Sequence, residues 1–334
     1  MEQAFLKIEL DPKSQYCVVM PAFNAEGFIA SALSSVARQE CKAREVIVVD
    51  DGSTDGTAAI ATAMGATVFQ HRISNGPGAA RNAGVAATCA PLIAFLDADD
   101  EWSVDHVARL LPLFANPGVC FAASQAEMFG VLDGQLIYEG ERDIAWDARD
   151  DLIRRNPITQ SAAMVSRSGF QQVGGYDTSY RLCEDYDLWQ RLAPLGLFAL
   201  DRAFTARYRV HSGQTSHRNA IELVELAWKA RRSAVRSRAV SASASEMRHI
   251  RDLVDAAARD EMRDAVRSGS RRVLEIIRAQ WTGARADLVG GAVAARNLTI
   301  RDRFLSAYQD VACEVRGAIR RARYPGHTAE KVKN

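Results

Sequence analysis

The sequence has no long hydrophobic run and few cysteines. None of its apolar stretches approaches the ~20 residues that a membrane-spanning helix requires, and its first residues lack the basic start and apolar stretch of a secretory signal. The six cysteines are scattered along the chain without the CxxC spacing of a zinc or redox site. We therefore expect a cytoplasmic globular protein with reduced thiols, and neither a disulfide framework nor a zinc site.

Net charge is also nearly absent, but the charges are unevenly distributed. The formal net charge is +1. Residues 1–215 carry 18 Lys and Arg against 27 Asp and Glu, a net −9, whereas residues 216–334 carry 24 against 14, a net +10. A split of this kind indicates two parts with different partners. We predict two domains, residues 1–215 and residues 216–334.

Strand and helix patterns alternate through the first hundred residues, which is typical of βαβ units and a parallel sheet. After residue 114 further strand patterns follow, with one late helix beginning near Glu184, so a mixed sheet is expected. From residue 220 onward, apolar residues recur at helical spacing. We predict an α/β fold, a Rossmann-type mixed sheet flanked by helices, followed by an all-helical region. The strands of the parallel half are expected at 16–20, 45–49, 66–70 and 91–96, and its helices at 26–39, 57–64 and 78–87.

The most informative local feature is a group of carboxylates directly after a buried strand. Residues 92–102 read Leu-Ile-Ala-Phe-Leu-Asp-Ala-Asp-Asp-Glu-Trp, so Asp97, Asp99 and Asp100 lie where open α/β sheets bind their ligands. Three carboxylates within four positions repel one another unless a cation neutralises them. Mg²⁺ and Mn²⁺ prefer oxygen ligands, and Mg²⁺ is commonly held by one or two carboxylates together with substrate phosphates. The cluster indicates metal-dependent handling of a phosphorylated donor; a solvated acidic turn before a helix is the alternative.

Six short motifs follow one another along the chain. Starting at residues 18, 45, 75, 97, 184 and 208, they read Val-Val-Met-Pro-Ala-Phe-Asn-Ala-Glu, Glu-Val-Ile-Val-Val-Asp-Asp-Gly-Ser-Thr-Asp-Gly-Thr, Asn-Gly-Pro-Gly-Ala-Ala-Arg-Asn-Ala-Gly, Asp-Ala-Asp-Asp, Glu-Asp-Tyr-Asp-Leu-Trp and Tyr-Arg-Val-His-Ser. These motifs resemble those of family 2 glycosyltransferases, which have the GT-A fold. They occur in family order and together span residues 14–215, with no counterpart in residues 220–334. Each is weak alone, but six in order are highly specific. The resemblance implies a GT-A-like catalytic domain that transfers a sugar from a nucleotide sugar with inversion.

Residues at the ends of the first strands are candidates for binding the donor nucleotide. Backbone amides and a helix N-terminus can receive a nucleotide after the first strand, although Asn24 is equally suited to capping that helix. Asp51 is expected to accept from the base and Asp55 to have a structural role. Arg81 is suited to the nucleotide or, about equally, to an internal salt bridge. The residues assigned to the nucleotide sugar are Pro21, Ala22, Asn24, Glu26, Asp51, Arg81, Asp97 and Ala98.

The two late motifs offer a general base and a second metal ligand. Attack on the anomeric carbon requires the acceptor hydroxyl to lose its proton, which a carboxylate of raised pKa accepts well. We assign Asp185 as this base and Glu184 as the neighbour that raises its pKa; a simple preference for acidic residues at a helix N-terminus is the competing interpretation. Asp99, with Asp100 as the alternative, and His211 are assigned to Mg²⁺ or Mn²⁺, while a lone histidine after a strand is more often structural.

These features predict an inverting, metal-dependent glycosyltransferase that uses a nucleotide sugar, with UDP as the favoured nucleotide. By family analogy, the acceptor is a glycan, a lipid-linked sugar or a protein in bacterial surface polysaccharide or glycoconjugate synthesis. A sugar-1-phosphate nucleotidyltransferase and a non-catalytic glycan-binding or scaffold protein are the alternatives. For the basic C-terminal region we rank internal docking or homo-oligomerisation first and peripheral association with the inner face of the cell membrane second. No signature of nucleic-acid binding is present.

Overall fold

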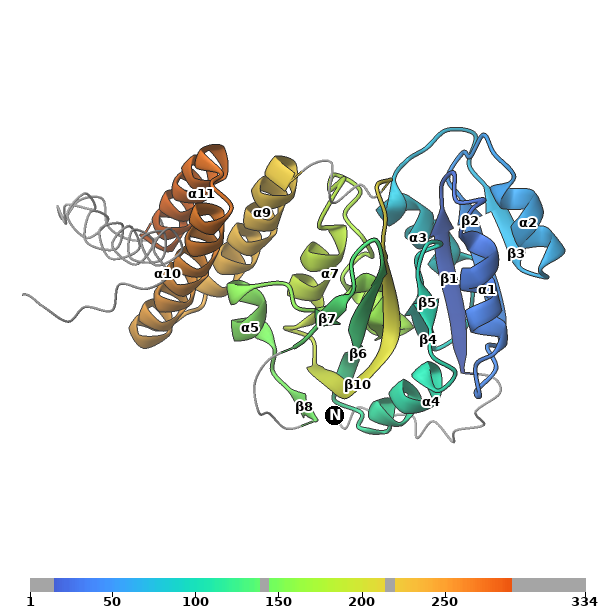
Figure 1. Ribbon diagram of the computed structural model, residues 1–334. Helices are drawn as coiled ribbons and strands as arrows, with labels where there is room; N and C mark the ends of the chain where they lie inside the picture. The colour runs from blue at the N-terminus through green and yellow to red at the C-terminus, as the bar shows by residue number, and fades with distance from the viewer. Residues whose placement is uncertain (1–14, 139–143, 214–219, 290–334) are drawn as a thin grey trace, which may run out of the picture. The chain divides into compact units, whose positions relative to one another are not determined.

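The computed structural model describes residues 15–138, 144–213 and 220–289 (Figure 1). The chain divides into two compact units between Ala234 and Val235. This division lies within helix α9 (Ala220–Ala239), whereas the predicted domain boundary lies between residues 215 and 216. The first part of α9 belongs to the first unit because its side chains complete that unit's core: Trp228 and Ala230 are fully buried.

A mixed ten-stranded sheet forms the centre of the first unit (Figure 1). In its parallel half, β1 lies between β2 and β4, and β3 pairs with the outer side of β2. All residues of β1 and β4 are buried, which explains why interior parallel strands read as continuous apolar runs. The predicted alternation of strands and helices is confirmed. The elements are β1 (Tyr16–Ala22), α1 (Ile29–Ala37), β2 (Glu45–Asp50), α2 (Thr57–Ala63), β3 (Thr67–Gln70), α3 (Pro77–Ala86) and β4 (Leu92–Phe95).

The other half of the sheet mixes directions, as predicted. Strand β9 runs antiparallel between β4 and β6, and β6 pairs in parallel with β10. The short strand β5 continues from the acidic cluster and pairs with β10, so this cluster and the end of β10 are held at the same place. The strands are β5 (Glu101–Trp102), β6 (Val119–Gly130), β7 (Gly134–Leu136), β8 (Ala145–Trp146), β9 (Ala163–Ser166) and β10 (Leu197–Val210).

Helix α7 (Glu184–Leu192) carries the late acidic motif and is anchored in the core. Its first turn contains three acidic residues, which the positive end of the helix dipole favours. Further along, Trp189 is fully buried and stacks on Phe121 of β6 with ring centroids 5.8 Å apart. The start of α7 is therefore fixed relative to the sheet. The remaining helical elements of this unit are α4 (His106–Leu110), η1 (Leu111–Ala115), α5 (Arg149–Arg154), η2 (Gln160–Ala162) and α6 (Arg167–Gln172).

Helix α3 lies unusually close to the sheet because of a glycine. A Cβ placed on Gly84 would lie only 2.5 Å from Cγ1 of Val19 in β1, so a larger residue would push the helix away from the strand. Arg81 lies three residues earlier on α3 and is only 3% exposed. The close packing of α3 therefore carries an arginine into the interior near the ends of the strands.

The second unit is helical in its described part, which confirms the predicted helical character there. Helix α10 (Ala244–Arg267) begins with a capping box between Ser243 and Glu246 and pairs with α11 (Arg271–Val289). Trp281 packs between them and donates from Nε1 to Oδ1 of Asp255 at 2.8 Å. The continuation of the prediction beyond residue 289 lies outside the described residues. In the described part of the chain, no helix is both long enough and apolar enough to cross a bilayer.

Candidate active site

Two loops at the ends of β1 and β2 interlock through the residues assigned to the nucleotide. Asn24 accepts from the amide of Thr54 at 2.9 Å and donates from its own amide to Ser53. Glu26 accepts from the amide of Gly56 at 2.8 Å, and its own amide donates to Asp55. Asn24 does not cap α1, which begins at Ile29 with Phe28 as its N-cap, so that interpretation is wrong. Pro21 and Ala22 are the last residues of β1, and Ala22 accepts from the amide of Asp51 at 2.8 Å.

Asp51 is buried and anchors the segment between β3 and α3. Its carboxylate accepts from Nδ1 of His71 and Oγ of Ser74, both at 2.7 Å, and from the amides of Asn75 and Gly76. Burial raises the pKa of Asp51, but these hydrogen bonds outweigh it and leave the pKa below its ordinary value. Because the carboxylate already has these partners and is 3% exposed, its clearest role here is to shape the loop. Recognition of the base by Asp51 stays a prediction.

Arg81 joins the acidic cluster to the late helix. Its Nη2 donates to Oδ1 of Asp97 at 2.6 Å, and its Nη1 donates to Oε1 of Glu184 at 2.7 Å. The guanidinium also lies over the ring of Tyr176, 5.4 Å from its centroid. The sequence left a nucleotide contact and an internal salt bridge open for Arg81. In the structure Arg81 forms internal salt bridges with Asp97 and Glu184. Asp97 and Glu184 are distant in sequence, so this arginine brings the end of β4 and the start of α7 into one site.

Asp99 and His211, the two residues assigned to the metal, lie together. Nε2 of His211 is 3.0 Å from Oδ2 of Asp99, and their side chains are 21% and 29% exposed. Burial and the negative charge of Asp97 raise the pKa of Asp99, while its hydrogen bond with His211 lowers it. Among the described residues, no group of three or more His, Cys, Asp or Glu side chains forms a complete metal cage. This partly open pair fits an ion whose remaining ligands are substrate phosphates and water, as is usual for Mg²⁺.

Asp100 has a different environment from Asp99. It is 1% exposed; its Oδ2 accepts from Oγ of Ser161 at 2.5 Å and its Oδ1 from the amide of Arg209 at 2.7 Å. Burial and the neighbouring carboxylates, Asp99 and Asp97, raise the pKa of Asp100 well above its ordinary value. One oxygen thus ties the acidic turn to Arg209 of β10, two residues before His211, and the other ties it to Ser161 of η2. Asp99 is the more accessible carboxylate, while Ala98 between the acids is buried.

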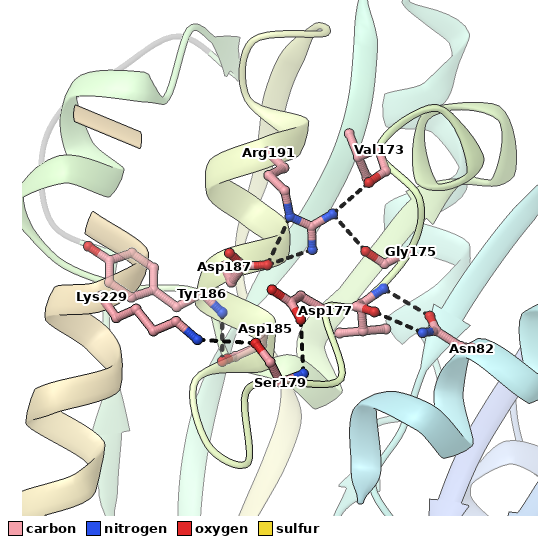
Figure 2. Close-up of polar contacts among 11 residues, drawn as sticks. Asn82, Val173, Gly175, Asp177, Ser179, Asp185, Tyr186, Asp187, Arg191 and Lys229 are labelled. Atoms are coloured by element: carbon pink, nitrogen blue, oxygen red, sulfur yellow. Dashed lines mark hydrogen bonds and ion pairs between the residues drawn. The ribbon is translucent and has the colours of Figure 1, made fainter. Parts of the chain in front are cut away.

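Asp185 lies in the first turn of α7, after a residue in an unusual backbone conformation. Cys183, the N-cap of this helix, has a φ of 60°, which is uncommon for a residue other than glycine. Oδ1 of Asp185 accepts from the amide of Tyr186 at 2.7 Å (Figure 2), and Oδ2 accepts from Nδ2 of Asn156 at 3.1 Å. Burial and the charge of Glu184 raise the pKa of Asp185 to about 7. A carboxyl group of this kind can accept a proton near neutral pH.

The loop that contains residues 173–176 is held in place beside Arg81 by hydrogen bonds. The side-chain amide of Asn82 accepts from the backbone N–H of Tyr176 at 2.8 Å and donates to its C=O at 2.9 Å. Arg191 of α7 donates to the carbonyls of Val173 and Gly175 (Figure 2). These contacts join the loop to α3 and α7 and hold Tyr176 where its ring lies beside Arg81.

Three residues in these networks were not predicted from the sequence. Ser161 accepts from the amide of Asp97 and donates to Asp100, Asn156 contacts Asp185, and Tyr176 packs against Arg81. No local pattern distinguishes Ser161 or Asn156 from ordinary loop residues. Arg209, whose amide donates to Asp100, is already part of the last motif, two residues before His211.

Comparison with known proteins gives the family. The sequence model of Glycosyl transferase family 2 matches residues 17–160. The succinoglycan biosynthesis protein ExoU of Rhizobium meliloti is 32% identical over 260 residues, covering 71% of this chain and 75% of that protein. The Escherichia coli UDP-Glc:alpha-D-GlcNAc-diphosphoundecaprenol beta-1,3-glucosyltransferase WfaP is 26% identical over 213 residues, covering 62% of this chain and 82% of that protein.

Solved structures share the fold. Staphylococcus aureus TarS 1–349 in complex with UDP-GlcNAc superposes with a TM-score of 0.53 and 15% identity, covering 86% of this chain and 95% of that chain. The mannosyltransferase PcManGT of Pyrobaculum calidifontis, in complex with GDP-Man and Mn²⁺, gives a TM-score of 0.52 and 17% identity, covering 85% and 90%. The predicted GT-A-like fold class is confirmed, and the nucleotidyltransferase and scaffold alternatives are set aside. The chain belongs to glycosyltransferase family 2 and is a glycosyltransferase.

Proposed function

We propose that this chain is an inverting glycosyltransferase that uses a UDP-sugar and a divalent cation, Mg²⁺ or Mn²⁺. The observation that carries this proposal is the position of Arg81 between Asp97 and Glu184. This pairing joins the acidic cluster, where a nucleotide diphosphate would be held, to the helix that carries Asp185. UDP-Glc in the name of WfaP and UDP-GlcNAc in the TarS complex support UDP as the nucleotide.

Asp185 is the general base in this proposal. An acceptor oxygen attacks the anomeric carbon from the side opposite to the diphosphate, so one bond forms as the other breaks and the configuration inverts. The hydroxyl proton passes to a carboxylate oxygen of Asp185, and the bonding electrons leave with the nucleoside diphosphate. A pKa of about 7 makes Asp185 a stronger base than an ordinary aspartate while part of it is still ionised at neutral pH. Glu184 contributes to that pKa and is itself held by Arg81.

Asp99 and His211 would hold the cation. A bound divalent ion supplies positive charge that stabilises the departing diphosphate. The chain's own part is to keep the two ligands in place: Nε of Arg209 donates to the carbonyl oxygen of Asp99 at 2.8 Å, and Asp100 accepts from the amide of Arg209 near the end of β10. The Mn²⁺ complex of the mannosyltransferase of this fold is in keeping with such an ion.

The acceptor is proposed as a hydroxyl of a growing surface polysaccharide or glycoconjugate, on a glycan, a lipid-linked sugar or a protein. ExoU is named for succinoglycan synthesis, and the name of WfaP gives a sugar linked to diphosphoundecaprenol as its acceptor. For residues 216–334, acceptor placement, homo-oligomerisation and association with the inner face of the cell membrane are the proposed roles. Attraction between its net positive charge and anionic lipid would favour the last of these.

A screen of nucleotide sugars tests the proposal. The full chain is incubated with each UDP-, GDP- and dTDP-sugar, with Mn²⁺, Mg²⁺ or a chelator, and release of the nucleoside diphosphate is measured. We expect metal-dependent release from one UDP-sugar, and loss of that release in Asp185→Asn. The matched control is Asp264→Asn, whose side chain is 76% exposed on α10. Release that persists in the chelator, or in Asp185→Asn, would contradict the proposed chemistry.

A further inference from the structure

One arginine of α9 is buried against the end of helix α5. Arg231 is 1% exposed; its Nε donates to the carbonyl of Ile153 at 2.6 Å and its Nη2 to the carbonyl of Arg154 at 3.2 Å. Its guanidinium also lies over the ring of Trp228, 4.2 Å from the centroid. Burying a cation is costly unless its donors are satisfied, so this placement requires the end of α5 to stay where it is.

The end of α5 is held by side chains from two other helices. The last carbonyls of a helix have no partner within the helix, and α5 ends at Arg155 in an extended conformation, without a glycine cap. On α7, the hydroxyl of Tyr186 and Nε2 of Gln190 both donate to the carbonyl of Leu152. Arg231 of α9 supplies the donors for the next two carbonyls. Three consecutive carbonyls are thus fixed by α7 and α9 together.

The next residues reach the proposed base. Asn156 follows the last of these carbonyls by two positions, and its Nδ2 donates to Oδ2 of Asp185 at 3.1 Å. Asn156 is exposed and its Oδ1 accepts from the amide of Ile158 at 3.3 Å. The backbone that Arg231 contacts therefore ends two residues before the amide that contacts Asp185.

We propose that Arg231 is a positioning residue for the transfer reaction: by holding the carbonyls of Ile153 and Arg154, it keeps Asn156 on Asp185. This inference rests on the proposed role of Asp185 as the base. Arg231 lies on α9, beyond the six catalytic motifs, so the region after residue 215 supplies part of the support of the active site.

Loss of this support has a defined electrostatic consequence. The Asn156 amide stabilises the ionised form of Asp185, as does Arg81 of α3, whereas burial and Glu184 on the same helix oppose ionisation. Tyr176, in the loop before α7, also has an electrostatic interaction with Asp185. Removing the Asn156 contact should therefore raise the pKa of Asp185. A weakened hydrogen bond to an exposed amide corresponds to roughly a three- to tenfold increase in proton affinity.

The experiment measures the pKa of Asp185 without requiring turnover. Urea unfolding of the full chain is followed from pH 5 to pH 9, with and without Asp185→Asn, and the pH dependence of the difference gives the pKa in the folded state. We expect Arg231→Met and Asn156→Ala each to raise the pKa of Asp185, with a three- to tenfold increase in its proton affinity. The double variant should raise this pKa no further than Asn156→Ala alone. The matched control is Lys229→Met, which removes a cation of α9 that contacts Ser179 instead of α5 (Figure 2), and should leave the pKa unchanged.

Several outcomes would overturn the proposal. If Arg231→Met folds and leaves the pKa unchanged, or if its effect adds fully to that of Asn156→Ala, then Arg231 does not act through Asn156. If Arg231→Met does not fold, Arg231→Lys serves instead, because it keeps the charge and one donor; it should give a smaller shift in the same direction, and no shift overturns the proposal. Failure of the glycosyltransferase assay leaves this measurement intact, so the two hypotheses are separable.

Discussion

Replacing Asp185 by asparagine should make the folded protein more stable above neutral pH while abolishing turnover. In the folded chain, burial and Glu184 raise the pKa of Asp185 from its ordinary value of 3.8 to about 7. Between these two values the folded state keeps a proton that the unfolded state has lost. Because the folded state then binds more protons, the free energy of unfolding falls as the pH rises through this window and levels off above pH 7. Asparagine has no proton to lose and removes this penalty.

The magnitude follows from the width of the window. Roughly three pKa units, at 1.36 kcal/mol each, correspond to about 4 kcal/mol when Asp185 is fully ionised. Between pH 5 and pH 8 the upper two units are crossed, so the stability of Asp185→Asn relative to wild type should improve by about 3 kcal/mol over that range. Asparagine cannot reproduce both hydrogen bonds that the carboxylate accepts from Tyr186 and Asn156. That loss does not depend on pH, so the change between pH 5 and pH 8 isolates the ionisation.

Urea unfolding followed by tryptophan fluorescence at pH 5, 6, 7 and 8 measures this change. Trp189 is fully buried on the same helix as Asp185, so its exposure on unfolding contributes to the change in emission of the five tryptophans. Asp264→Asn provides the matched loss of an exposed carboxylate. If the stability difference between Asp185→Asn and wild type is flat across the series, the carboxylate has an ordinary pKa and the reasoning that makes it a base near neutral pH is refuted.

Three further substitutions or truncations test other parts of the structure. Asp99→Asn should weaken the binding of UDP in the presence of Mn²⁺ at least tenfold by calorimetry, because it removes a proposed metal ligand; unchanged affinity would contradict that assignment. Gly84→Ala should lower the free energy of unfolding by about 1–3 kcal/mol in urea, since the new Cβ would lie 2.5 Å from Cγ1 of Val19. A chain of residues 1–239 should fold and bind UDP, whereas residues 1–219 should lose the cooperative thermal transition, because the buried side chains of α9 complete the core of the first unit. Equal stability of the two truncated chains would show that α9 is dispensable.

The parallel half of the sheet could be predicted because its signals are local. Interior strands are covered on both faces and read as continuous apolar runs, so the expected strand at 45–49 matches β2 (Glu45–Asp50) closely. The start of the first helix was less accurate. Residues 26–28 carry a helical pattern, but Glu26 is held by the loop after β2, and α1 begins only at Ile29. Contacts with a distant segment decide that boundary, and a local pattern does not contain them.

The site shows the same division between local and distant information. The acidic cluster and the late acidic motif are visible in the sequence, because residue type and position at a strand or helix end suffice to identify them. Which carboxylate does what depends on partners from other segments. Asp100 accepts hydrogen bonds from Ser161 and from β10, and Asp51 accepts them from the segment at 71–76. No local sequence pattern indicates either pairing.

The partners of the five site carboxylates explain why two of them are suited to chemistry. Asp97 and Glu184 share the cation Arg81, and Asp100 is buried with both oxygens hydrogen-bonded. Asp99 meets an imidazole and Asp185 an amide side chain, and in both residues burial and a neighbouring acid raise the pKa. Ionisation of these two groups is opposed by their surroundings, and unlike Asp100 both remain partly exposed, so each can gain an external positive partner. For Asp99 that partner would be a metal ion, and for Asp185 it would be the proton of the acceptor hydroxyl.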